Sequence, residues 1–229
     1  MALSEPIAPP RARVTARSRL SRRWFGGGTD GNEQLTAVVG VILLLLFAVL
    51  GVTILFIGNG KMLWLHLFLG TLLVGPVALK LASTGYRFTR YYTANAAYRR
   101  KGPPHPLMRV LGPFVILSTL GVFFTGLLLL IDGPGAGSLV RELHKLFFFG
   151  WLAVVGVHVL WHLVELPHGV FAVSRGQGRT RDLPGSRGRG LVLIVAIVGG
   201  AVLALIFLPD IHSWTSGLAY HPHHLTIGG

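Results

Sequence analysis

The sequence predicts an all-α fold, a polytopic membrane bundle of five transmembrane helices. Hydrophobic residues make up 52% of the 229-residue chain and charged residues only 13%, which is typical of a protein that lies in lipid. Five separate apolar runs have about the 20 residues that a helix needs to cross the hydrocarbon. The positive charges gather between these runs, so membrane topology explains the formal net charge of +13 better than nucleic-acid binding does.

The five runs divide the chain into three regions. Residues 1–33 are basic and rich in Pro, Ser and Gly, and we expect a disordered cytoplasmic arm that touches anionic lipid headgroups. Residues 34–209 form the membrane domain, and residues 210–229 form an extracytoplasmic tail that contains histidines. The predicted spans are residues 35–57, 62–83, 107–131, 142–165 and 190–209.

The first two spans are joined by a tight turn. Residues 35–57 are apolar apart from threonine and glycine and carry no histidine, which predicts a scaffold helix. Residues 58–61 contain two glycines and an asparagine, as a turn does, and the second span then carries His66, Pro76 and Lys80. Because Pro76 lacks a backbone N–H, we expect it to kink this helix.

The later spans are separated by basic or glycine-rich segments. Residues 86–102 interleave Arg and Lys with aromatic residues, a composition that suits the headgroup region. The third span has no titratable group beyond Arg109 at its start. A glycine-rich loop at residues 132–138 precedes the fourth span, and a basic loop at residues 168–190 leads into the histidine-free fifth span.

The distribution of positive charge predicts the orientation of the chain. Residues 1–33, 84–109 and 168–190 hold 17 of the 21 Lys and Arg residues, and these segments fall on one side of an alternating topology. Because loops rich in Lys and Arg remain in the cytoplasm, the amino terminus is expected there and the carboxy terminus outside.

Three histidines lie on one face of the fourth span. His158 and His162 follow His144 by 14 and 18 residues, and a helix turns by about 100° per residue, so all three rings project from the same side. His144 and His158 are about 21 Å apart along the axis. Ionisable residues inside a span are costly and usually face a site or a cavity, so three in register point to a common function.

His66 on the second span is expected at the depth of His144. The two residues lie about 7 Å and about 3 Å below the extracytoplasmic boundaries of their antiparallel helices. Two imidazoles that face each other in an apolar bundle suit a haem iron with two histidine ligands. Gly70, on the face of His66, leaves room for a flat macrocycle, and Phe148 and Trp151 can wall or separate cofactors.

The cytoplasmic half of the bundle holds candidates for a second site. Lys80 follows His66 by 14 residues, the spacing that also separates the first two histidines of the fourth span. Lys80 can therefore oppose His158 as a ligand, neutralise a haem propionate, or snorkel to the headgroups. His105 is another candidate partner. For His158 and His162, a second haem, a quinone site and interhelical hydrogen bonds all remain open.

Cysteine is absent, which excludes disulfides, iron–sulfur clusters and covalently attached c-type haem within this chain. The sequence also lacks a P-loop, a dinucleotide fingerprint, a catalytic triad and a zinc-protease motif, so hydrolysis and nucleotide chemistry have no support. Three tail histidines can form a loose copper or zinc site, or simply lie in a solvated tail. They are His221, His223 and His224.

This histidine pattern resembles the membrane-embedded b-type cytochromes of the cytochrome b superfamily, including the haem subunits of formate dehydrogenases and nickel–iron hydrogenases. The resemblance covers about residues 35–166. It implies that His144 and His158 are ligands of an outer and an inner haem, with His66 as the outer partner. Such proteins usually offer a fourth histidine, often on the first span, which has none here. The segments KLASTGYRFTRYY and YRRKGPP are similar to uncharacterised high-GC bacterial membrane proteins of this cytochrome-like type.

The resemblance implies a haem b electron-transfer subunit in the bacterial cytoplasmic membrane, with one or two haems. Electrons would pass between membrane quinone and an extracytoplasmic oxidoreductase subunit, so the chain would be part of an enzyme rather than a complete one. A metal- or proton-handling transporter and a haem-free membrane anchor are the alternatives. Only two of the five spans carry histidines, which favours a cofactor held between two helices over a continuous pathway.

Overall fold

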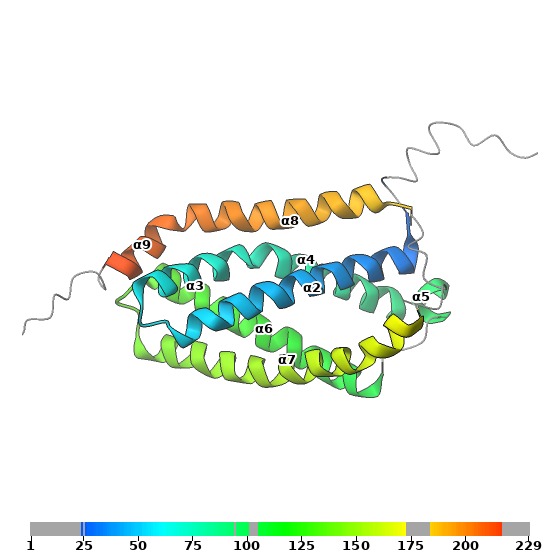
Figure 1. Cartoon of the computed structure of the whole chain (residues 1–229), viewed down its shortest axis with the longest axis horizontal. Coiled ribbons are helices and arrows are strands. Elements are labelled where there is room, and N and C mark those ends of the chain that lie inside the picture. Colours follow the sequence, from blue (N-terminus) through cyan, green and yellow to red (C-terminus); the bar gives the residue numbers. More distant parts are fainter. Residues whose placement is uncertain (1–23, 25, 94, 101–104, 173–183, 217–229) are drawn as a thin grey trace, which may run out of the picture.

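The structure, a computed structural model, describes residue 24 and residues 26–93, 95–100, 105–172 and 184–216. Within these residues all regular structure is helical, and five helical stretches are long and apolar enough to cross a membrane. The predicted all-α bundle of five spans is confirmed in this respect. The helices are α2 (Gly28–Leu55), α3 (Gly60–Leu72), α4 (Val74–Tyr92), α5 (Ala96–Arg100), α6 (Pro106–Asp132), α7 (Ser138–Ala172), α8 (Ser186–Ile206) and α9 (Leu208–Ser216) (Figure 1).

The second span is interrupted, as expected from its proline. α3 ends at Leu72 and α4 begins at Val74, so together they form one stretch of 33 residues with a break near Leu73. Pro76 has no N–H to donate to the carbonyl of Leu72, which explains the interruption of the helix there. α4 then continues to Tyr92, beyond the predicted end of the span.

Both ends of the membrane domain contain more helix than the sequence predicts. α2 already begins at Gly28, inside the predicted disordered arm. Asp210 to Ser216, predicted as tail, belong to α9, which packs against α3 and buries Ile211 completely. Ile211 thus lies on the side of α9 that faces the bundle. The basic residues at positions 11–23 and the predicted tail beyond Ser216 lie outside the described residues.

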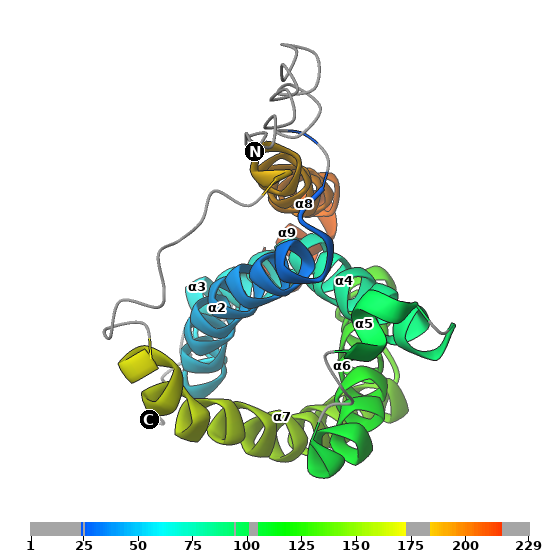
Figure 2. The ribbon, with the colours of Figure 1, turned by 90° about the vertical axis from the view of Figure 1, so that its right-hand side faces the viewer.

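Viewed along their length, α2, α3, α4, α6 and α7 stand in a ring, and α8 lies outside the ring (Figure 2). α8 crosses α3 and α4 very closely. A Cβ added to Gly75 would overlap the carbonyl oxygen of Ala196, and one added to Gly200 would overlap that of Leu72. Small residues at both positions therefore allow the two backbones to touch, as they do in other closely packed membrane helices.

Two helical hairpins, α2–α3 and α6–α7, form opposite parts of the ring (Figure 2). The turn between α2 and α3 and the turn between α6 and α7 lie at the same end of the bundle, the hairpin end (Figure 1). Asn59 caps α3 by accepting a 2.9 Å hydrogen bond from the N–H of Lys61, and Gly133 adopts φ 73° after α6. The opposite end carries α5 and its arginines and is called the basic end.

The buried apolar core is small and lies between α2 and the α3–α4 stretch. Its fully or nearly buried members are Val39, Leu43, Leu73 and Val77. Most other large apolar side chains face outward, as expected where lipid replaces water. None of the α7 side chains from Ser138 to Val164 is fully buried, so the inward face of this helix is only loosely covered.

Candidate functional site

His66 is held by a threonine of the preceding helix. Its ring nitrogen Nδ1 lies 3.0 Å from Oγ1 of Thr53, near the end of α2. The Thr53 hydroxyl also donates a 2.6 Å hydrogen bond to the carbonyl of Leu50 on its own helix. Thr53 itself is only 1% exposed, so this contact is shielded from water.

His144 has the same arrangement in the other hairpin. Its Nδ1 lies 3.0 Å from Oγ1 of Thr125 on α6. The Thr125 hydroxyl donates a 2.7 Å hydrogen bond to the carbonyl of Gly121, and Thr125 is 4% exposed. Each histidine is therefore near the start of a helix and bonds to a buried threonine of the helix before it.

These paired bonds determine the tautomer of both histidines. A hydroxyl has a single proton, and both threonine hydroxyls give it to a backbone carbonyl. Each threonine oxygen must then accept a hydrogen bond from the Nδ1–H of its histidine. Nδ1 therefore carries the proton, and Nε2 of His66 and of His144 keeps the lone pair. Nε2 is thus the nitrogen that can bind a metal in both rings.

The two rings share one region at the hairpin end. His66 lies six residues into α3 and His144 six residues into α7, and both helices begin at the hairpin end (Figure 1). Glycines keep space around both. A Cβ on Gly126 would lie 3.0 Å from Cε1 of His144, and nothing lies within 4 Å of a Cβ built on Gly70, one turn after His66. The position beside Gly70 is therefore open.

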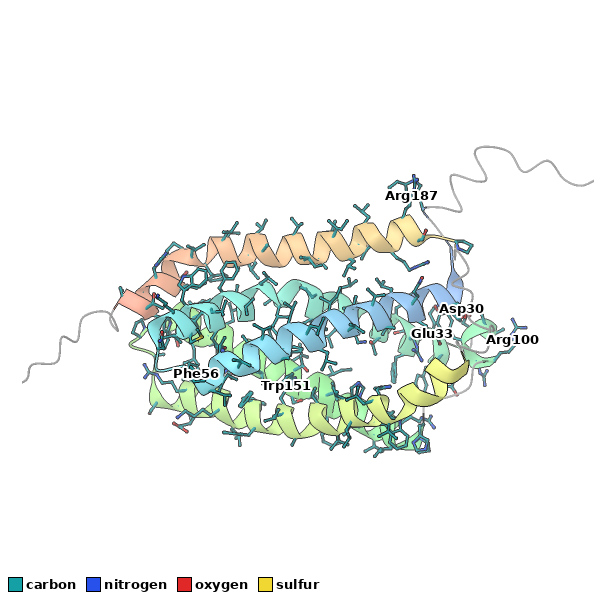
Figure 3. The ribbon with its side chains drawn as sticks, in the orientation of Figure 1. Asp30, Glu33, Phe56, Arg100, Trp151 and Arg187 are labelled. Atoms are coloured by element: carbon teal, nitrogen blue, oxygen red, sulfur yellow. The ribbon has the colours of Figure 1, made fainter. Side chains whose placement is uncertain are left out.

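An aromatic layer lies between the two histidine levels of α7. Trp151, labelled in Figure 3, is seven residues from both His144 and His158. Its ring centroid is 4.9 Å from that of Phe47 on α2. Its Nε1–H donates a 3.1 Å hydrogen bond to Oγ1 of Thr119 on α6. Trp151 therefore connects three helices at a level between His144 and His158.

The second polar cluster lies on the basic-end side of this aromatic layer. The rings of His158 and His162 on α7 are 4.7 Å apart, and Lys80 lies on α4. Nζ of Lys80 donates a 2.7 Å hydrogen bond to the carbonyl of Thr36 on α2. Nδ1 of His158 is buried and has no hydrogen-bond partner within the described structure.

Two other groups of histidines have different positions. Nδ1 of His105 accepts a 3.4 Å hydrogen bond from the N–H of Leu107, so His105 caps α6, and its ring lies 4.6 Å from that of Trp161. The tail residues His221, His223 and His224 lie outside the described residues. Among the residues that the structure does describe, no group of three or more His, Asp or Glu side chains is arranged to hold a metal ion.

The sequence analysis missed the threonines. Thr53 and Thr125 were included in apolar spans, because a threonine in a membrane helix usually bonds only to its own backbone. The available signal was weak but real. Each threonine lies in the helix before a connecting turn. The next helix begins at Gly60 or at Ser138, and in both cases a histidine follows six residues later.

Comparison of the chain with protein-family models, with curated proteins and with solved structures finds no match. The evidence for function is therefore the geometry of the chain itself. That geometry consists of five apolar helices, a histidine in each of two hairpins bonded to a buried threonine of the preceding helix, and the adjacent rings of His158 and His162.

Proposed function

We propose that the chain is a membrane b-type cytochrome that holds one haem b between His66 and His144. The observation that carries this proposal is the matched pair of threonine–histidine bonds, each 3.0 Å long. Metal-binding histidines characteristically donate their other ring N–H to an oxygen, which fixes both the tautomer and the orientation of the ring. A structural role alone does not require the same nitrogen to be exposed on both histidines.

The residues present fit the requirements of haem. The site has two neutral nitrogen donors on separate hairpins, in the same part of the interior. Gly70 and Gly126 limit the bulk beside them, and the surrounding helices are apolar. Bound there, haem iron would supply one-electron transfer, with its potential tuned by the ligands and by the low polarity of the surroundings.

The protein residues would then orient the group and exclude water. Thr53 and Thr125 hold the ligand rings, and the aromatic layer around Trp151 closes the inner side of the site. The distribution of Lys and Arg supports an orientation with the hairpin end outside a bacterial cytoplasmic membrane. Electrons would accordingly pass between membrane quinone and an extracytoplasmic redox subunit.

The test is the haem content of purified protein expressed with a supply of haem. His66→Ala and His144→Ala should each abolish the absorption bands of b-type haem, because one histidine alone holds the iron weakly. His105→Ala and His212→Ala serve as matched controls and should retain the wild-type amount. Haem content that is unchanged in both ligand variants would refute the site, and folded wild type without haem would favour transport or a membrane anchor.

A further inference from the structure

The segment that leads from α4 through α5 into α6 carries positive charge without acidic residues of its own. Residues 84–112 contain five arginines and one lysine but no Asp or Glu. Within the part of the chain that the structure describes, none of these arginines forms an ion pair with a carboxylate. Asp30 and Glu33, which lie at the same end of the bundle, belong to α2 (Figure 3). The segment therefore presents positive charge that an anion can compensate.

One arginine of this segment is held by a contact between two helices. Nη2 of Arg109, in the first turn of α6, donates a 3.4 Å hydrogen bond to the hydroxyl oxygen of Tyr92 on α4. The Tyr92 ring packs against Phe88, one turn earlier on α4, with 4.5 Å between the ring centroids. Retention of positive charge in the cytoplasm explains why the segment is basic, but it does not require a guanidinium to be positioned by a tyrosine.

Arg109 and Tyr92 keep most of their hydrogen-bond donors for a ligand. A guanidinium has five N–H groups, and the contact with Tyr92 uses one of them. The tyrosine oxygen accepts this bond, and within the described structure its own O–H has no acceptor. Both side chains are exposed, Tyr92 to 58%. Several donors that converge beside a fixed guanidinium suit the oxygen atoms of a phosphate group.

An exposed apolar stripe leads from Arg109 into the membrane. Pro113, Leu117 and Leu120 follow Arg109 by 4, 8 and 11 residues, which places them within about 80° of it around α6. All three are exposed, Leu117 to 64% and Leu120 to 49%. Leu120 lies about 16 Å from Arg109 along the helix axis, about half the thickness of the hydrocarbon core. The stripe is therefore as long as one leaflet of the bilayer.

A phosphate group joined to apolar chains of this length is a phospholipid. We propose that Arg109 and Tyr92 form a binding site for one anionic phospholipid. Their N–H and O–H groups donate to the phosphate oxygens, and an acyl chain lies along the α6 stripe. A zwitterionic lipid has the same phosphate but adds an ammonium group, which the surrounding arginines repel. The site therefore selects lipids by the net charge of the headgroup, and it lies at the opposite end of the bundle from His66 and His144.

Native mass spectrometry of the full chain in detergent tests this site by titration with phosphatidylglycerol or phosphatidylcholine. We expect the first phosphatidylglycerol to bind about tenfold more tightly than phosphatidylcholine, because its phosphate is held by charge-assisted bonds without a repelled ammonium group. Arg109→Gln should abolish most of this preference. Tyr92→Phe deletes only the hydroxyl and should weaken the binding of phosphatidylglycerol about threefold.

Matched controls separate a site from general attraction to the basic end. Arg99→Gln removes the same charge from α5, and Tyr91→Phe removes a hydroxyl next to Tyr92 in the sequence. Both should bind phosphatidylglycerol within twofold of wild type. Haem content and helicity by circular dichroism should match wild type in all four variants. If Arg109→Gln does not fold, Tyr92→Phe still decides, because its ring can keep its contact with Phe88.

Three results would overturn the lipid site. Equal binding of the two lipids by the wild type would show that the headgroup charge is not recognised. A loss in Arg99→Gln as large as that in Arg109→Gln, or wild-type affinity in Tyr92→Phe, would show that the donors proposed here do not form the site. Displacement of phosphatidylglycerol by millimolar inorganic phosphate would identify free phosphate, rather than a lipid, as the occupant.

Discussion

The hydroxyl oxygen of Thr125 lies 3.0 Å from Nδ1 of His144, and it reaches this ring from the preceding helix. Thr53 and His66 repeat the relationship at the same distance in the other hairpin. In both pairs the threonine proton is used in a bond to its own backbone, so the histidine must be the donor. Two hairpins thus repeat the same threonine–histidine arrangement.

Removing the threonine oxygens should weaken haem binding without removing a ligand. Thr53→Val and Thr125→Val keep the side-chain shape but delete the acceptor for Nδ1–H, and we expect haem affinity to fall by about 10- to 100-fold. Haem titration of the purified apoprotein measures this change. Thr53→Ser and Thr125→Ser retain the hydroxyl and should bind haem nearly as well as wild type. Equal affinity in the valine and serine variants would show that these contacts do not support a ligand.

The close approach of His144 to α6 should make Gly126 intolerant of side chains. A Cβ at this position would lie 3.0 Å from the ring, so Gly126→Val should displace the imidazole and reduce haem occupancy. Gly150→Val is the matched control, because nothing lies within 4 Å of its added Cβ. Occupancy is read from absorption per protein, with helicity checked by circular dichroism. Normal occupancy in Gly126→Val would contradict the placement of this ring.

The crossing of α8 with the second span should be sensitive to a single methyl group. Gly200→Ala would place Cβ against the carbonyl of Leu72, and overpacking of this kind costs about 1–3 kcal/mol. Gly199→Ala has open space and should leave stability nearly unchanged. Thermal unfolding in detergent compares the two variants. Equal unfolding temperatures would indicate that α8 is more loosely attached than this contact implies.

The absence of cysteine makes the predicted topology directly measurable. Asn59→Cys introduces a thiol at the hairpin end, and Ala97→Cys introduces one at the basic end. A membrane-impermeant maleimide added to intact cells should label the first variant, and it should label the second only after permeabilisation, because positively charged loops stay in the cytoplasm. The reverse pattern would place the proposed haem site on the cytoplasmic side.

Much of the fold follows from sequence because hydrophobic runs and charge have simple physical consequences. The five apolar helices and the break before Pro76 needed only the length of a span and the missing proline N–H. α9 was not foreseen, because Ile211 provides its buried anchor in a segment with few other apolar residues. A short helix of this kind depends on packing with its neighbour rather than on its own pattern.

The site was only partly predictable for a related reason. The helical spacing of His144, His158 and His162 indicates a common face, and depth alone brings His66 level with His144. The hydrogen bonds of Thr53 and Thr125 depend on how two helices pack, which no periodicity encodes. Likewise, Lys80 was expected in several roles, and the Thr36 carbonyl that holds its Nζ became visible only in three dimensions.

The most direct measurement is haem stoichiometry together with low-temperature electron paramagnetic resonance of the oxidised, purified protein. One haem b per chain with a low-spin ferric signal typical of two histidine ligands is expected. The signal should disappear in His66→Ala and His144→Ala but persist in His158→Leu. Absence of haem from folded, haem-supplied protein, or a signal that survives both ligand substitutions, would contradict a haem held between His66 and His144.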